Sequence, residues 1–337
     1  MTTSRRASFR RRALLGVAAG GTALLARPRQ AAAADAAWPT RPVKLVVGYP
    51  AGGSTDVCAR ILAEDFRPRL PQPVIVENRT GANGSLGAAH VAAATDGHTL
   101  LVSNTSTMTV NHLLYRDTRY DPLRDLVPVA TITISPFILA VNARNPRTQG
   151  VRTLQDLVAL AKRQPGRVTY ASAGVGNLQH LNMELLLARA GIQLLHVPYR
   201  GSSLATNALV AGEVDVLLET PTTGGPLVQA GTFAALATTG GTRWRELPEV
   251  PTVEEAGFPG FTAAFWNGLV APAGTPPELV RRLHGLMQAA AEAPATRQLL
   301  LAQGEVFVLD PERFRERIAA DIERNAAVIR AAGIEMQ

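Results

Sequence analysis

Short apolar runs alternate with segments of helical periodicity in the first third of the chain. The run Val43–Val47 predicts a buried strand that ends at Gly48, and the apolar positions within 56–66 recur at helical spacing. Two further strands are predicted at 74–76 and 99–102, with a helix over 86–94 between them. Strands that alternate with helices in this way indicate βαβ units and a mainly parallel sheet.

A second series of the same kind follows Pro136. Thr153 and Asp156 form a capping-box pattern that predicts a helix ending near Arg163. The strand–glycine loop–helix unit at 43–66 recurs at 168–190, as two similar halves would produce. The further elements predicted here are strands at 168–172, 194–197 and 214–218 and helices at about 177–190 and at 202–211.

Two helices are predicted near the C-terminus from their start signals. Thr275-Pro276-Pro277-Glu278 places a capping threonine, a proline and an acid in the order typical of a helix N-terminus, with Thr275 as N-cap. Asp310-Pro311 begins a final helix that ends at Gly333. The whole pattern predicts an α/β protein, and about 300 residues after the first 34 suit two domains.

Charge is distributed unevenly along the 337 residues. The chain has 34 basic and 27 acidic residues, a net charge of +7, but residues 1–34 contain seven arginines and no acid. Without these seven, 27 basic residues remain against 27 acidic ones, so the body of the chain is formally neutral. A neutral body offers no basic face for nucleic acid, and we expect no nucleic-acid partner.

The first 34 residues have the features of an export signal. Arg5–Arg12 is strongly basic, Ala13–Ala26 is apolar, and Ala32-Ala33-Ala34 fits a cleavage site. The apolar stretch is shorter than the roughly 20 residues that a membrane-spanning helix needs, which disfavours an anchor. The paired arginines fit a twin-arginine signal as well as a Sec signal, and both remain open. We therefore expect export to the periplasm.

The loop that follows the first strand is a candidate anion site. The loop lies between a strand end and a helix start. Free N–H groups and the positive end of the helix dipole at such a place favour a carboxylate or phosphate. Ser54 or Thr55 is expected to cap the helix. The alternative interpretation is a simple tight turn, and no Gly-Lys-Ser/Thr follows that would make a P-loop. The candidates are Tyr49, Gly52, Gly53, Ser54, Thr55 and Asp56.

Two more loops follow strand ends and are expected to converge with the first. Ligands of open α/β sheets lie outside the carboxyl ends of the strands, although such polar residues also commonly satisfy turns. The dinucleotide interpretation of Gly174-x-Gly176 fails because Gln179 takes the place of the third glycine. The candidates here are Ser103, Asn104 and Thr105 in one loop and Ser172, Ala173, Gly174, Gly176 and Asn177 in the other.

No catalytic or metal site emerges from the remaining polar residues. The histidines show no metal-binding spacing, the single Cys58 is expected to be buried packing, and no nucleophile–base pair can be assembled. His180 either supports its helix or contacts a ligand. Glu219, at the end of an apolar strand, either reaches the same cleft or is a structural partner. We expect no catalytic residue, metal or cofactor.

Taken in order, several segments resemble the Bug family, the TctC-like extracytoplasmic receptors of tripartite tricarboxylate transporters. The resemblance extends over nearly the whole chain after the leader. The segments that carry it are Tyr49-Pro50-Ala51-Gly52-Gly53-Ser54-Thr55-Asp56, Val76-Glu77-Asn78-Arg79, Asp96-Gly97-His98-Thr99-Leu100, His196-Val197-Pro198-Tyr199-Arg200-Gly201, Leu247-Pro248-x-Val250-Pro251-Thr252-Val253 and Trp266-x-Gly268-Leu269-x-Ala271-Pro272-Ala273-Gly274-Thr275-Pro276.

This resemblance implies the type II periplasmic binding protein fold, with two α/β domains and a ligand cleft between them. It places domain 1 at 38–138 and 262–337 and domain 2 at 139–261. Family members bind small carboxylates, including di- and tricarboxylates, acidic amino acids and aromatic acids, with loops and ordered water. The family usually has Asp where Glu219 stands and often Phe where Tyr49 stands. The implied contacts are the candidates given above, with His180 also at a family position.

The sequence therefore predicts a monomeric periplasmic receptor that binds an organic carboxylate and performs no reaction. Ligand binding would close the hinge, and the closed form would deliver the ligand to membrane transporter subunits. Two alternatives remain open. One is a periplasmic sensing subunit for a membrane sensor kinase, and the other is a small-molecule hydrolase that uses the same cleft.

Overall fold

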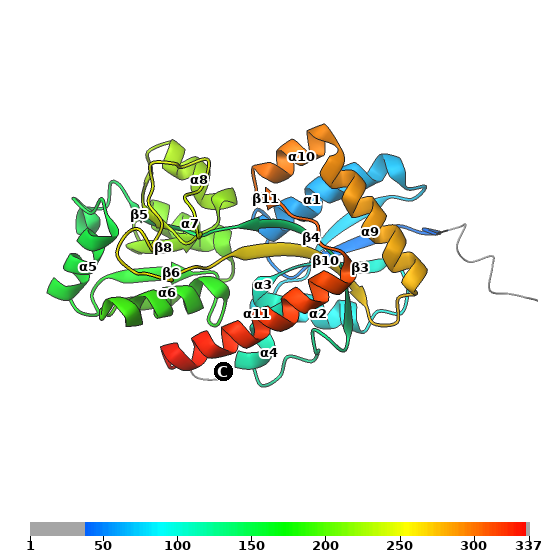
Figure 1. Cartoon of the computed structure of the whole chain (residues 1–337), viewed down its shortest axis with the longest axis horizontal. Helices are drawn as coiled ribbons and strands as arrows, with labels where there is room; N and C mark the ends of the chain where they lie inside the picture. The colour runs from blue at the N-terminus through cyan, green and yellow to red at the C-terminus, as the bar shows by residue number, and fades with distance from the viewer. Residues whose placement is uncertain (1–37, 335–337) are drawn as a thin grey trace, which may run out of the picture. The chain divides into compact units, whose positions relative to one another are not determined.

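The computed structural model describes residues 38–334, so the predicted export signal at 1–34 lies outside the described residues. The chain forms two mixed sheets, each with helices on both faces (Figure 1), which confirms an α/β fold with two domains. We call them lobe 1, around the six-stranded sheet, and lobe 2, around the five-stranded sheet. No helix within residues 38–334 combines the length and the apolar character that crossing a membrane requires.

Lobe 1 contains a sheet with the strand order β11-β4-β10-β3-β1-β2. Leu45 and Val47 of β1 pack toward α1 and α9, whereas Val46 packs toward α2 and α11. A strand buried on both faces needs such a continuous apolar run. The strands are β1 (Val43–Val47), β2 (Val74–Asn78), β3 (Thr99–Asn104), β4 (Leu126–Ser135), β10 (Phe265–Pro272) and β11 (Glu305–Val306). The helices are α1 (Ser54–Phe66), η1 (Arg67–Arg69), η2 (Ala82–Gly84), α2 (Ser85–Ala92), α3 (Thr105–Thr109), α4 (Asn111–Leu114), α9 (Pro277–Glu292), α10 (Pro294–Leu301) and α11 (Pro311–Ala332).

Lobe 2 contains a sheet with the strand order β7-β6-β8-β5-β9. Tyr170 of β6 packs with α5 and α6, and the next residue, Ala171, packs with α7 on the opposite face. The strands are β5 (Ile138–Asn142), β6 (Thr169–Ser172), β7 (Leu195–Pro198), β8 (Val216–Glu219) and β9 (Phe233–Thr238). The helices are η3 (Pro146–Thr148), α5 (Leu154–Arg163), α6 (Leu178–Ala190), α7 (Ser202–Ala211) and α8 (Pro221–Gln229).

The strands predicted in each half pair in parallel, as expected, but each sheet as a whole is mixed because it contains a reversed inner strand. β5 is antiparallel to β8 and β9, and β10 is antiparallel to β3 and β4. Both are the strands by which the chain arrives from the other lobe (Figure 1). The parallel strands of each sheet end at the edge facing the other lobe, so a chain entering at that edge must run the opposite way. Alternation of strands and helices along the sequence cannot reveal this reversal.

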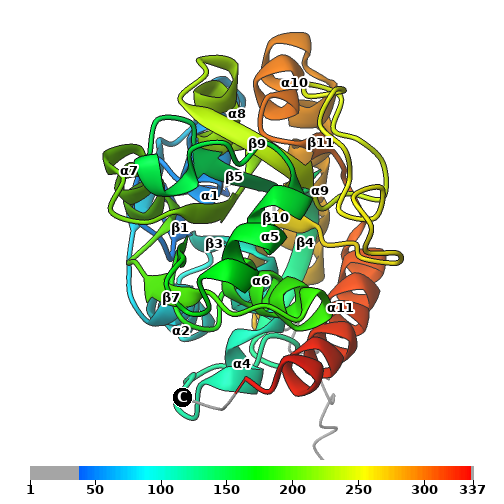
Figure 2. The same cartoon turned by 90° about the vertical axis from the view of Figure 1, so that its left-hand side faces the viewer.

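The change of sheet falls between Ser135 and Ile138 and again between Thr238 and Phe265. The predicted domain limits at 138 and 262 lie close to these changes but remain a prediction. The C-terminal helix α11 contacts both lobes, because it packs on β4 near its start, bonds to α3 through Asn325 in its second half, and packs on α6 near its end (Figure 2). Two polypeptide crossings and one helix therefore join the lobes.

The local signals at helix ends agree with the structure at some helices and differ from it at others. The capping box of Thr153 and Asp156 is present, and α11 begins after Asp310 and ends at Gly333, as predicted. The N-cap of α9 is Pro276 and not Thr275, and it has no side-chain cap. α1 begins at Ser54 behind Gly53, so neither Ser54 nor Thr55 caps it. Both hydroxyls are thereby left for other partners.

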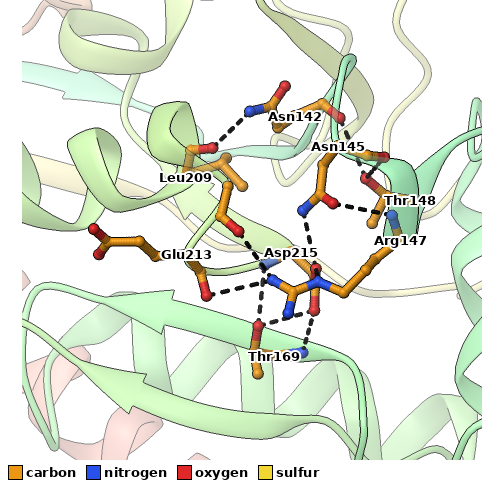
Figure 3. A network of polar contacts seen from close by, with 9 residues as sticks. Asn142, Asn145, Arg147, Thr148, Thr169, Leu209, Glu213 and Asp215 are labelled. Carbon is orange, nitrogen blue, oxygen red and sulfur yellow. Dashed lines mark hydrogen bonds and ion pairs between the residues drawn. The ribbon is translucent and has the colours of Figure 1, made fainter.

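Asp215 is a buried acid at the amino end of β8, and it links several segments of lobe 2 (Figure 3). It lies at the end of the sheet opposite to the loops that follow the carboxyl ends of the strands. Its carboxylate accepts hydrogen bonds from Asn145 and from the amide and hydroxyl of Thr169, and it pairs with Arg147 at 2.7 Å. A buried carboxylate needs such partners. These contacts give Asp215 a structural role within lobe 2.

Candidate ligand-binding site

A pocket lies between the lobes at the carboxyl ends of β1, β3, β6 and β8. Its empty space, including the part open to solvent, is about 460 Å³. No charged side chain is among the described residues that line it. The lining residues are Tyr49, Pro50, Gly53, Ser54, Thr55, Asn104, Ser106, Phe137, Ala173, Asn177, Leu178, Gln179, Ser202, Thr220 and Phe265.

The first turn of α1 directs two hydroxyl groups to the pocket. Ser54 Oγ accepts a hydrogen bond from Asn267 Nδ2, and Thr55 Oγ1 accepts one from Asn104 Nδ2, each at 3.0 Å. An amide nitrogen can only donate, so each hydroxyl keeps its own hydrogen to donate elsewhere. The N–H groups of a first helical turn also lack intrahelical partners. This wall of the pocket is therefore rich in hydrogen-bond donors.

Asp56 holds the loop in front of this helix. Its carboxylate accepts hydrogen bonds from the Gly52 amide at 2.9 Å, from Arg60 and from Asn78, whose Nδ2 also donates to the Tyr49 carbonyl. Burial raises the pKa of Asp56, but these hydrogen bonds outweigh burial and hold the pKa below its usual value. Asp56 thus positions the loop and does not itself line the pocket.

Tyr49 presents its ring to the pocket and turns its hydroxyl away. The hydroxyl donates to the Asn83 carbonyl at 2.8 Å and lies 3.1 Å from Thr107 Oγ1. Burial raises the pKa of Tyr49 to about 12, so the phenol stays neutral. The hydroxyl is therefore used inside lobe 1 and is not offered to the pocket.

The loop after β6 forms the facing wall. Asn177 caps α6 by accepting from the His180 amide at 2.9 Å, and the Leu178 amide donates to Ser106 Oγ of lobe 1 at 3.0 Å. Gly176 has a φ of +68°, and a Cβ there would lie 2.9 Å from Leu114 Cδ1 of lobe 1. Glycine is required at such a position. The loop therefore lies directly against lobe 1.

His180 supports this loop from behind. Its Nδ1 accepts from the Gly176 amide at 3.1 Å, and its ring stacks on His196 at 4.1 Å, which in turn stacks on Tyr170 at 4.7 Å. Burial lowers the pKa of His180 to about 4 and, together with the neighbouring His180 ring, lowers the pKa of His196 to about 3. Both rings are neutral near pH 7, and His180 is a structural support.

Glu219 lies one layer behind the pocket wall. Its carboxylate accepts from Gln179 Nε2 at 3.1 Å, from the Thr220 amide at 2.7 Å and from Thr206 Oγ1 at 3.1 Å. Burial raises the pKa of Glu219, and its hydrogen bonds only partly offset that effect. Two of its partners, Gln179 and Thr220, line the pocket, so Glu219 acts on the pocket through them.

The structure divides the predicted site residues into two groups. Those that line the pocket are Tyr49, Gly53, Ser54, Thr55, Asn104, Ala173 and Asn177. Those that lie behind or beside the lining are Gly52, Asp56, Ser103, Thr105, Ser172, Gly174, Gly176, His180 and Glu219. Lining residues absent from the predicted site residues are Pro50, Ser106, Phe137, Leu178, Gln179, Ser202, Thr220 and Phe265.

The positions of strand ends could have identified some of the lining residues that were not predicted, because Thr220 directly follows β8 and Ser202 begins the helix after β7. Phe137 and Phe265 come from the two crossings between the lobes, where no glycine or polar motif marks them. Within residues 38–334, no group of three or more histidine, cysteine, aspartate or glutamate side chains is arranged to hold a metal ion. Cys58 is buried 3.6 Å from Thr133 Oγ1, and burial raises its thiol pKa to about 12.

Two α/β lobes with a pocket at the carboxyl ends of their strands, in which a few hydroxyl and amide groups stand among apolar side chains, define a solute-binding protein of the periplasmic type. The sequence profile described as tripartite tricarboxylate transporter family receptor, TctC, matches residues 58–334, and the chain belongs to this family. It is a family of binding proteins and not of enzymes. The resemblance inferred from the sequence is thereby confirmed.

Individual relatives support the assignment. Protein BugT of Bordetella pertussis is 36% identical over 303 residues, which cover 89% of this chain and 92% of BugT. The structure of R. palustris Rpa4515 with adipate is 33% identical with a TM-score of 0.84, covering 89% of this chain and all of that one. MatC from Rhodopseudomonas palustris with bound malate is 31% identical with a TM-score of 0.79, covering 87% of this chain and all of that one.

Proposed function

We propose that this receptor binds a small organic carboxylate in the pocket between its lobes and delivers it to a tripartite tricarboxylate-type transporter in the membrane. The protein would reach the periplasm by means of the leader at 1–34. The observation that carries the proposal is the donor-rich wall at the start of α1, where Ser54 and Thr55 keep their hydroxyl hydrogens. Relatives with bound adipate and malate support a carboxylate ligand.

Neutral donors are sufficient for one carboxylate in such a pocket. Hydrogen bonds to an ionised acceptor are stronger than those between neutral groups, and the helix N-terminus adds a favourable field. Arg200, the cation nearest to the site along the sequence, is exposed and does not line the pocket. We propose that hydroxyl and amide groups, and not an ion pair, hold the ligand.

Transport by this receptor would depend on movement of the lobes about their two crossings. Residues of both lobes line the pocket, and Leu178 and Ser106 bond across it. A ligand that contacts both lobes gains contacts only when the lobes are together, so it shifts the population toward that state. We propose that this state docks on the transporter.

Thermal unfolding of the purified protein with millimolar carboxylates tests the proposal. The panel contains adipate, succinate, malate, citrate, glutamate, aspartate, nicotinate and an aromatic acid. A ligand at 100 times its Kd stabilises the fold by about 2.7 kcal/mol, which raises the midpoint by several degrees. We expect such a shift with one chemical class, and a loss of the shift in Thr55→Val but not in the exposed-site control Thr80→Val.

A panel without any shift, together with a denatured-protein supernatant in which mass spectrometry finds no organic acid, would overturn the proposal. A carboxylate released from the denatured protein would instead show that the site was already occupied. This second measurement separates a wrong function from a site that was filled before purification.

A further inference from the structure

The buried acid behind the pocket draws hydrogens of two lining residues, Gln179 and Thr220, away from the ligand. Glu219 has no exposed surface, and one of its oxygens accepts from Gln179 Nε2 and from both the amide and the hydroxyl of Thr220. The other oxygen accepts from Thr206 Oγ1. An ionised carboxylate can only accept, so it draws the hydrogens of these groups toward itself.

No cation balances Glu219 from the described elements packed around it. Helices α7 and α8 and strands β5 and β9 contain no titratable side chain, and Tyr49 is the titratable residue among those lining the pocket. On α6, His180 and Glu184 belong to the stack around Tyr170, on the sheet face opposite to Glu219. The remaining charged residue of α6, Arg189, lies over the Phe261 ring.

The consequence is a difference between the lobe 1 wall and the lobe 2 wall. In lobe 1, Ser54 and Thr55 accept from amides and keep their hydrogens for a ligand. In lobe 2, the Thr220 hydroxyl donates to Glu219, and its oxygen lies 3.4 Å from Thr223 Oγ1. The Thr220 hydrogen is therefore withheld from a ligand, and the Thr220 oxygen keeps a lone pair for the pocket. Ser202 Oγ accepts from Gln179 Nε2 at 3.4 Å and keeps its hydrogen, so the contrast between the walls concerns Thr220 and not every hydroxyl of lobe 2.

We propose that Glu219 selects ligands that carry a carboxylate at one end and, where the other end meets Thr220, a hydrogen-bond donor, and that a second ionised carboxylate at Thr220 binds only as Glu219 takes up one proton. The inference rests on the proposed function and concerns the same pocket. The proton comes from solvent and adds to a carboxylate oxygen of Glu219. The neutral carboxyl no longer requires the hydrogen of Thr220, which then turns to the ligand.

The direction of the Glu219 pKa agrees with this coupling, because burial already favours the protonated form. By linkage, a dianion that binds the protonated form loses affinity tenfold for each pH unit above the pKa of Glu219 in the free protein. A ligand with one carboxylate and a neutral donor shows no such dependence. Gln179 and Thr220 transmit the change, so Glu219 is a positioning residue that does not touch the ligand.

Isothermal titration calorimetry with adipate and adipate monoamide tests the proposal between about pH 6.5 and 9, where carboxylates in solution are ionised. Titration in two buffers of different ionisation enthalpy counts the protons. We expect adipate to take up about one proton toward the upper end of the range and its affinity, relative to the monoamide, to fall tenfold per pH unit. If another dicarboxylate gives the larger thermal shift, that dicarboxylate and its monoamide replace this pair.

The substitution Glu219→Gln keeps the shape and removes the titration. We expect the ratio of the two affinities to become independent of pH, whereas the exposed control Glu213→Gln leaves the dependence intact. The proton count in the unaltered protein does not depend on how well the variant folds. Adipate binding at constant affinity without proton uptake overturns this inference alone, whereas the absence of binding by any carboxylate overturns the proposed function.

Discussion

Replacement of Asp56 by asparagine tests how the ligand loop is held. The buried carboxylate accepts from the Gly52 amide, from Arg60 and from Asn78. In the variant one oxygen becomes an NH₂ group that faces these donors. Removing one partner of a buried charge pair costs about 3–5 kcal/mol, but the Arg60 side chain is 53% exposed and can be rehydrated. We therefore expect a loss of about 2–3 kcal/mol.

The assay is urea unfolding of the Asp56→Asn variant, with Asp117→Asn as the control. Asp117 pairs with Arg119 on the surface, where both side chains are largely exposed, and its loss should change stability by less than about 1 kcal/mol. The pKa of Asp56 is lowered, so its contribution is present above the ordinary aspartate pKa and is lost as pH falls through the folded-state value. The two proteins should converge in acid, once the pH lies below the folded-state pKa of Asp56. Equal stability at pH 7 would refute the anchoring role of Asp56.

Three other substitutions address the site and its support. Gly176→Val should abolish carboxylate binding, because a side chain at φ +68° would meet Leu114. Arg200→Ala should change the Kd by less than about threefold. Calorimetry in which Arg200→Ala abolishes binding and Gly176→Val does not would contradict a site without a cation. The pKa of His180 is lowered to about 4, so its contribution is present above about pH 6.5 and is lost as pH falls toward 4. Between about pH 6.5 and 4, the urea midpoint of His180→Gln should fall less than that of the unaltered protein. An equal fall in both proteins would show that the loss of stability in acid comes from His196 alone.

Much of the fold follows from local sequence signals. The runs at β1 and β6 and the start signals of α5 and α11 lie where the pattern placed them. The direction of β5 and β10 could not be predicted, because it depends on the edge at which the chain enters a sheet. That is a property of the assembled lobes and not of any local pattern.

The site was partly predictable for a similar reason. Glycine loops after strands located the pocket loops that contain Ser54 and Ala173. Whether a side chain reaches the pocket depends on its tertiary partners. The His180 ring stacks on His196, and the Glu219 carboxylate lies behind Thr220, so neither side chain lines the pocket. Asn267, which orients the Ser54 hydroxyl, lies 213 residues away in sequence and has no motif.

The central position of β10 has a consequence for folding order. In the six-stranded sheet β10 lies between β3 and β4, with Leu269 paired to Val102, whereas the five-stranded sheet draws all its strands from residues 138–238. Pairing of residues so far apart in sequence requires closure of a long loop and slows folding. During synthesis the second sheet can therefore form while the first still exposes unpaired edges on β3 and β4. The six-stranded sheet is completed only when the last quarter of the chain has been made.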